Sequence, residues 1–218
     1  KELPGSILVL GGGVVGVEFA QIFSQFGVAV TLVESQDRLL AQEDPETVAV
    51  LQRQLLADGV MFHLGASVER IEVHDDRLRA HLAGGLSLSA HLVLVATGRR
   101  PLVQGLGLER IGLISTEHGI QTNTHGQTSL PHIYAVGDVQ GGPLLAHKAS
   151  AQAEAAIAHL CGRGRGTASL GIPQAVYTSP ELASVGLSEA QARTLADRLM
   201  ADHDTALDTL AREELGID

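Results

Sequence analysis

A glycine-rich turn between an apolar run and an amphipathic segment is the feature that most constrains the fold. Residues 6–10 are typical of a strand buried on both faces, and the six residues that follow have the spacing G-x-G-x-x-G. Gly11 permits a tight turn, Gly13 lets the backbone approach a diphosphate, and Gly16 lets helix and strand pack closely. The pattern predicts an α/β fold that binds a dinucleotide.

The segment after the turn has the periodicity of an amphipathic helix, which opens at Val14 and ends at Gly27. The N–H groups at the start of such a helix, together with its dipole, attract a diphosphate. The apolar residues lie on one stripe, the side of a helix that normally packs on the core: Val15, Phe19, Ile22 and Phe26.

An acidic residue, Glu34, ends the next strand 23 positions after Gly11. A carboxylate at this position accepts hydrogen bonds from both hydroxyls of an adenosine ribose, which indicates NAD. The 2′-phosphate of NADP would be repelled by roughly 4 kcal/mol at ~4 Å and an effective dielectric constant of 20. Arg38 is the only nearby cation that could offset this repulsion. The alternative is that Glu34 is merely a solvated charge at a strand end.

The rest of the chain continues the alternation of strands and helices, with Asp44-Pro45 as the start of a second helix. Glycines and arginines at 162–166 are typical of a linker. The further elements that we expect are strands at 28–33, 60–64, 92–96 and 133–136, an antiparallel meander at 67–88, a helix at 145–160, a strand pair around Ser179-Pro180 and a helix from Ser188.

Composition excludes several classes of function. The 218 residues carry a formal charge of −10, which argues against nucleic acid or an anionic membrane as a partner, because both need a basic face. No apolar run is long enough to cross a membrane. The single cysteine, Cys161, can form neither a disulfide framework nor a thiolate metal site, and we predict no metal.

Several separate motifs together resemble the pyridine nucleotide-disulfide oxidoreductases, flavoproteins that bind both FAD and NAD. The resemblance covers about residues 1–194, and its stretch Gly142 to Ala149 is closer to dihydrolipoamide dehydrogenase than to glutathione or mercuric reductase. The segments that carry it are Gly11 to Glu18 with Glu34, Ala96 to Pro101, Thr128 with Ile133 to Asp138, Gly142 to Ala149, and Val176 to Gly186.

The resemblance implies a role for individual residues. Asp138 matches the acid that accepts a hydroxyl of the flavin ribityl chain, although an Asp after a glycine turn can also cap a helix. The segment that approaches the flavin ring is Leu144, Leu145, Ala146 and His147. The positions that match NAD contacts are Gly11, Gly12, Gly13, Val14, Val15, Gly16, Val17, Glu18, Glu34, Val68 and Gly98.

Glu18 matches a position near the nicotinamide, on the first turn of the helix. The helix dipole favours an acid there in any case, so a ligand role and a purely helix-stabilising role are both open.

The chain departs from the family at three points. Family members are about twice as long, begin with their own G-x-G-x-x-G for FAD and a pair of redox-active cysteines, and end with a His–Glu base pair. Cys161 has no partner, and His203 with Asp208 is a poor match to that base pair. Residues 195–218 instead predict an acidic helical tail, of which 206–218 is similar to a cytosolic segment of vacuolar-iron-transporter-like proteins.

The expected architecture is therefore a Rossmann-like NAD-binding domain at 1–115, part of a FAD-binding domain at 116–168, the start of an α+β dimerisation domain at 169–194, and the tail. We expect an incomplete, cytoplasmic piece of a dihydrolipoamide dehydrogenase-like enzyme without catalytic residues of its own. The complete enzyme would be a homodimer and a partner of 2-oxoacid dehydrogenase complexes. The alternatives are a non-catalytic NAD-binding module, or a fragment of mercuric reductase, transhydrogenase or NADH oxidase.

Overall fold

The computed structural model describes residues 2–163 and 171–201 of the chain. These residues form two compact units, one from residues 2–96 together with 174–201, and one from Thr97–Pro173. The N-terminal segment of the first unit ends at Ala96, whereas the predicted NAD-binding domain extends to residue 115. The segment expected to start a separate dimerisation domain belongs to the first unit. No helix in the described ranges is long and apolar enough to cross a membrane.

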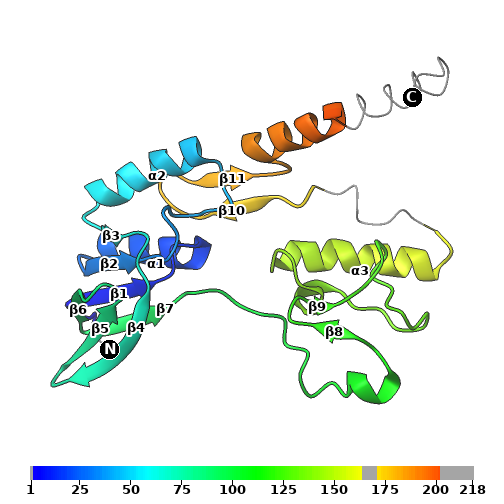
Figure 1. Cartoon of the computed structure of the whole chain (residues 1–218), viewed down its shortest axis with the longest axis horizontal. Helices are drawn as coiled ribbons and strands as arrows, with labels where there is room; N and C mark the ends of the chain where they lie inside the picture. The colour runs from blue at the N-terminus through cyan, green and yellow to red at the C-terminus, as the bar shows by residue number, and fades with distance from the viewer. Residues whose placement is uncertain (1, 164–170, 202–218) are drawn as a thin grey trace, which may run out of the picture. The chain divides into compact units, whose positions relative to one another are not determined.

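A four-stranded parallel sheet forms the centre of the first unit (Figure 1). Its order is β3-β2-β1-β7, and each neighbouring pair runs parallel. The expected strands at the four positions are confirmed: β1 (Ser6–Leu10), β2 (Ala29–Val33), β3 (Met61–His63) and β7 (Leu92–Val95). This is the α/β fold that the glycine turn predicts, with β1 between its partners β2 and β7.

Two helices pack on this sheet, α1 (Val14–Gln25) and α2 (Pro45–Ala57). Asp44 caps α2 as predicted, because its side chain accepts a hydrogen bond from the N–H of Glu46 and Pro45 occupies the first turn. The core of the unit lies between these helices and the sheet. Its fully buried side chains include Ile7, Val9, Val17, Leu32, Leu51 and Leu55.

The face that α1 buries is the opposite of the predicted one. The bulky stripe is 40–65% exposed: Val15, Phe19, Ile22 and Phe26. The residues that face the sheet are small or polar: Gly16, Val17, Ala20 and Gln21. The reason is the closeness of the helix to β1, since a Cβ built on Gly16 would lie 1.9 Å from the carbonyl oxygen of Gly11. No side chain fits at this point of closest approach, whereas Phe23, about two turns further along the helix, packs against the core cluster.

The predicted meander is confirmed as a three-stranded antiparallel sheet of β4 (Val68–His74), β5 (Arg77–Leu82) and β6 (Ser87–Ala90). Its apolar residues pack against the parallel sheet in a second cluster, formed by Leu8, Leu10, Val33, Ala80, Leu82 and Ala90. The meander thus connects β3 to β7 and packs on the face of β1 opposite to the helices.

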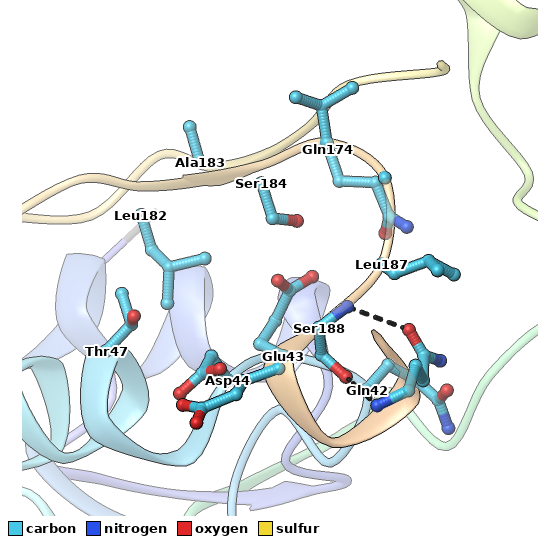
Figure 2. Close-up of a pocket in the computed structure, with 14 residues that line it drawn as sticks. Gln42, Glu43, Asp44, Thr47, Gln174, Leu182, Ala183, Ser184, Leu187 and Ser188 are labelled. Atoms are coloured by element: carbon cyan, nitrogen blue, oxygen red, sulfur yellow. Dashed lines mark hydrogen bonds between the residues drawn. The ribbon is translucent and has the colours of Figure 1, made fainter. Parts of the chain in front are cut away.

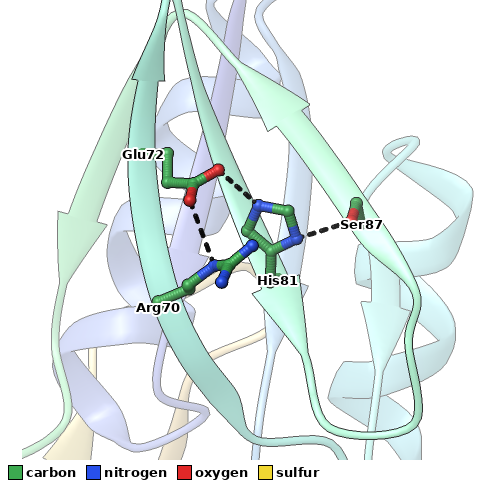
Figure 3. Close-up of polar contacts among 4 residues, drawn as sticks. All are labelled: Arg70, Glu72, His81 and Ser87. Carbon is green, nitrogen blue, oxygen red and sulfur yellow. Dashed lines mark hydrogen bonds and ion pairs between the residues drawn. The ribbon is translucent and has the colours of Figure 1, made fainter.

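Polar side chains link the three strands of the meander on its other face (Figure 3). His81 lies 2.9 Å from an oxygen of Glu72 on β4 and 3.0 Å from the hydroxyl of Ser87 on β6. Arg70 pairs with the same Glu72 at 3.2 Å. The hydrogen bond with His81 lowers the pKa of Glu72, and the nearby Arg70 charge adds to this. Cross-strand pairs of this kind hold the register of an exposed sheet.

The expected strand pair around Ser179-Pro180 is confirmed as the antiparallel hairpin of β10 (Gln174–Val176) and β11 (Leu182–Ser184). Gln21 of α1 holds it, because its amide donates to the carbonyl of Ser179 at 2.9 Å and accepts from the N–H of Ser179 at 2.7 Å. Val176 and Leu182 complete the core of the first unit. These contacts explain why the hairpin belongs to that unit.

The predicted helix at Ser188 is also present and is described from residue 189 to 201. The hydroxyl of Ser188 accepts from the N–H of Gln191, and the side chain of Gln191 accepts from the N–H of Ser188. Residues 202–218, and with them most of the predicted tail, His203 and Asp208, lie outside the described residues.

The second unit has little regular structure apart from one long helix. Its elements are η1 (Leu108–Ile111), β8 (Ser115–Thr116), β9 (Gly119–Ile120), η2 (Gly137–Gln140) and α3 (Ala146–Leu160). Residues 133–136 do not form the predicted strand; Tyr134 makes only an isolated bridge to Gln127. The neighbouring segment is short: the N–H of Thr128 donates to Ile133 and the N–H of Ala135 to Gly126, on either side of this single bridge. The predicted linker falls mostly on residues that are not described.

The close packing of Gly16 gives a first prediction. Gly16→Ala places a methyl group against the Gly11 carbonyl and should lower the free energy of unfolding by at least about 2 kcal/mol. Gly13→Ala is the matched control, because a Cβ at Gly13 meets nothing within 4 Å and should change stability by less than about 1 kcal/mol. Urea unfolding of the full chain measures both. Equal effects of the two substitutions would contradict this account.

Candidate functional site

The glycine turn lies at the carboxyl ends of β1 and β2, where α/β sheets bind ligands. Gly11 has a φ of +107°, a conformation that favours glycine, and its N–H donates to the carbonyl of Val33 at 2.8 Å. The turn is therefore hydrogen-bonded to the end of β2. This places Gly12 and Gly13 beside the residue that follows β2, which is Glu34.

Each glycine in the turn meets a different requirement. Gly13 is the N-cap of α1 and has no side chain with which to cap it, and a Cβ there would point into open space. Gly12 has no such room, since a Cβ would lie 2.8 Å from Leu39 and 3.0 Å from Glu34. The open side at Gly13 is the one from which a ligand can approach the first amides of the helix.

Glu34 is not a solvated strand-end charge. One of its carboxylate oxygens accepts from the N–H of Gly12 at 2.5 Å, and the other accepts from the N–H of Gln36 at 2.7 Å and the hydroxyl of Ser35 at 3.0 Å. These contacts fix the carboxylate beside the glycine turn. An ionised carboxylate has about four acceptor positions, so these three hydrogen bonds leave about one position, on the oxygen bound to Gly12, for a ligand.

The same contacts decide the ionisation of Glu34. Partial burial raises the pKa of its carboxyl, but the hydrogen bonds from Gln36, Gly12 and Ser35 outweigh burial and leave the pKa below its ordinary value. Glu34 is therefore anionic at neutral pH.

The sequence left open whether Arg38 could pair with a 2′-phosphate near the glycine turn; in the structure its side chain is bound elsewhere. Its guanidinium donates to the main-chain carbonyls of Ala41 and Glu43, the latter at 3.1 Å. It thereby ties the loop that leads into α2 into a compact shape. In this loop the N–H of Leu40 donates to the carbonyl of Gly12 at 2.9 Å, and Leu39 packs on Gly12. Sequence spacing gives no sign of this role.

Glu18 has a contact that the sequence did not indicate. Its carboxylate accepts a hydrogen bond of 2.8 Å from the N–H of Tyr177, just after β10. Glu18 and Gln21 thus both bind the hairpin segment that returns to α1. No spacing rule predicts this contact, because 159 residues separate its partners.

The remaining predicted nucleotide contacts occupy different places. Val14, Val15 and Val17 are in the first turns of α1, and Val68 begins β4 opposite Leu82. The side chain of Val68 packs on the second apolar cluster. Gly98 has a φ of +113° and belongs to the second unit.

The predicted flavin contacts lie within the second unit. Asp138 is exposed in η2. No side-chain hydrogen bond caps this short helix, so Asp138 does not act as its cap. Leu144 accepts a hydrogen bond of 3.2 Å from Arg99, and Leu145 is the N-cap of α3. The ring of His147 lies 2.7 Å from the carbonyl of Pro173.

Lys148, which sequence reasoning missed, lies next to this segment. It is only 5% exposed, and its ammonium group donates to the carbonyl of Gly141. Burial lowers the pKa of Lys148, and the charge of Asp138 counters part of that effect. Cys161 is exposed at the end of α3.

Residues 1–153 match the family model "Pyridine nucleotide-disulphide oxidoreductase". Dihydrolipoyl dehydrogenase of Bacillus subtilis is 39% identical over 197 residues, which is 89% of this chain and 43% of that protein. Dihydrolipoyl dehydrogenase of Chlorobaculum tepidum is 41% identical over 198 residues, covering 88% and 42%.

A solved structure is similar over the same part of the chain. The HOCl-induced flavoprotein disulfide reductase RclA of Escherichia coli has a TM-score of 0.83 and 34% identity, covering 89% of this chain and 45% of its own. The chain therefore spans less than half the length of these relatives. The likeness of the C-terminal segment to vacuolar-iron-transporter-like proteins finds no support. The family match and the glycine turn agree, and the chain belongs to the pyridine nucleotide-disulphide oxidoreductase family.

Proposed function

We propose that this chain is the NAD-binding portion of a dihydrolipoyl dehydrogenase-like flavoprotein. The observation that carries the proposal is the anchored carboxylate of Glu34 beside the open side of Gly13. This combination offers an anionic acceptor for ribose hydroxyls next to unblocked amides for a diphosphate. The relatives named dihydrolipoyl dehydrogenase support the choice of enzyme class.

Two side chains support NAD rather than NADP. Glu34 is held anionic where a 2′-phosphate would lie, and like charges at ~4 Å repel by roughly 4 kcal/mol at an effective dielectric constant of 20. Arg38 is committed to two main-chain carbonyls and is not available to pair with that phosphate. The fixed loop thus removes the one cation that would have offset the repulsion.

The residues present fit both cofactors of the family. The first turn of α1 would hold the diphosphate of NAD, and Glu34 its ribose, while Asp138 and the segment from Leu144 to His147 would contact FAD. NAD and FAD together supply the hydride transfer. The chain's own contribution is to bind and orient: Glu34 fixes the ribose, and the amides at Gly13 fix the phosphates.

The activity of a whole enzyme is a further part of the proposal. In such an enzyme the flavin would be coupled to a dithiol/disulfide pair, and the protein would act as a homodimer. The 218 residues contain Cys161 as their single cysteine, so this chain cannot provide the pair.

The charge at Glu34 gives a prediction about cofactor choice. The full chain should bind NADH at least tenfold more tightly than NADPH at low salt, because the anchored carboxylate repels the extra phosphate. Glu34→Arg should narrow or reverse this preference. Asp76→Arg, the same change of charge in the turn between β4 and β5, is the control and should leave it intact. Equal dissociation constants for NADH and NADPH in the wild type would refute the idea.

The lowered pKa of Glu34 gives a prediction about acid stability. A carboxylate whose pKa is lower in the folded state stabilises the fold above its unfolded pKa, and this stabilisation is lost as the pH falls through the folded pKa. The wild type should therefore be more stable than Glu34→Gln at pH 7. The difference should shrink as the pH falls below about 4.5. Thermal unfolding from pH 7 to pH 3 measures it, and parallel curves would contradict the assignment.

The division of the cofactor contacts gives a prediction about activity. The purified chain should not retain FAD and should show no lipoamide-dependent oxidation of NADH, since Asp138 and residues 144–147 offer only one side of a flavin site. Adding a separately made FAD domain from a related dihydrolipoyl dehydrogenase should restore flavin binding. Protein that purifies with stoichiometric FAD and turns over lipoamide by itself would overturn this proposal.

A further inference from the structure

A polar cavity of about 370 Å³ lies within the first unit, away from the glycine turn (Figure 2). Three segments form its walls: the loop before α2 with the first turn of that helix, the hairpin of β10 and β11, and the start of the helix at Ser188. The volume is within the range of small-molecule sites in proteins. Neither Gly11–Gly16 nor Glu34 lines it.

Glu43 is the unusual residue of this cavity. It is only 6% exposed, yet within the described ranges no hydrogen bond or ion pair involves its carboxylate. Only the main chain of Glu43 forms hydrogen bonds: its N–H donates to the carbonyl of Leu40, and its carbonyl accepts from the guanidinium of Arg38. This nearby cation is therefore bound to the carbonyl of Glu43 and not to its carboxylate. Most of the residue is covered, but its carboxylate oxygens are not among the fully buried atoms without a partner, so they face the open space of the cavity, where a bound cation would pair with them.

The other two acids that line the cavity already have partners. Asp44 accepts from the N–H of Glu46 at 3.3 Å, and Glu189 pairs with Arg193 at 2.6 Å. One free carboxylate suits a monovalent cation, whereas calcium requires six to eight oxygen ligands. Consistently, the described residues contain no group of three or more His, Cys, Asp or Glu side chains arranged for a metal ion.

The walls around Glu43 combine hydroxyl groups with aliphatic side chains. Thr47 and Ser184 offer oxygen acceptors, and the capping contacts between Ser188 and Gln191, drawn as dashed lines in Figure 2, shape one wall. The aliphatic surface comes from Leu182, Val185 and Leu187. An alkylammonium ion needs up to three acceptors for its N–H groups and an apolar surface for its chain.

We propose that this cavity binds the ammonium group of an aliphatic primary amine, with Glu43 as its anionic anchor. The amine is either a free small molecule or the side chain of a lysine in another protein, since both present the same group on the same kind of chain. The site is independent of the proposed NAD site.

Titration of the ¹⁵N-labelled full chain with n-pentylamine tests the proposal. The amide signals of Ser184 and Ser188 should shift in a saturable way. n-Pentanol, which has the same chain and no charge, should bind at least tenfold more weakly, because it lacks the ion pair with Glu43. Equal binding of the two probes, or saturable shifts only elsewhere in the chain, would overturn the proposal.

Two variants assign the binding to Glu43. Glu43→Gln should weaken pentylamine binding at least tenfold. Glu46→Gln, which removes the same charge from an exposed position three residues away, should leave it within twofold. Undiminished binding by a folded Glu43→Gln chain would overturn the assignment. If that chain does not fold, the comparison of amine with alcohol in the wild type still decides.

A third probe distinguishes the sources of the amine. Nα-acetyl-lysine methylamide presents a lysine side chain as it occurs in a protein. Tighter binding of this probe than of pentylamine indicates a partner protein, and tighter binding of pentylamine indicates a free amine. NADH titrated into the same sample reports the proposed cofactor site separately, so that failure of one proposal does not imply failure of the other.

Discussion

The contact between Gly16 and the carbonyl of Gly11 is the constraint on which the first unit depends. Because no Cβ fits between them, α1 lies directly on β1 at this point, and the helix buries the face that carries Gly16, Val17, Ala20 and Gln21. The same contact brings the first amides of the helix to the end of the strand. The architecture and the candidate nucleotide site thus follow from one local requirement for glycine.

On the proposed function, the loop from Glu34 to Glu43 would make this scaffold selective between NAD and NADP. Glu34 and Arg38 carry opposite charges four residues apart, yet they do not pair with each other; both bind main-chain groups instead. The carboxylate is fixed beside Gly12, and the guanidinium is fixed away from it. Selection between NAD and NADP would therefore depend on where the charges of Glu34 and Arg38 are held, and not only on their presence in the loop.

The hairpin of β10 and β11 shows how distant segments complete the unit. Gln21 and Glu18, on successive turns of α1, bind the main chain of Ser179 and Tyr177. Val176 and Leu182 fill the core beneath. The hairpin also provides one wall of the cavity around Glu43, so the packing that closes the core also creates the second candidate site.

The sequence by itself predicted the α/β fold, the meander, the cap of α2 by Asp44, the helix from Ser188 and the glycine turn followed by Glu34, because each leaves a recognisable pattern or spacing in the chain. It could not determine which face of α1 is buried, since periodicity locates a stripe but not the space available to it. Only the tertiary structure decided the engagement of Arg38, the contact of Glu18 with Tyr177, and the missing strand at 133–136. These depend on which partners folding brings within hydrogen-bond distance, and spacing along the chain does not encode that.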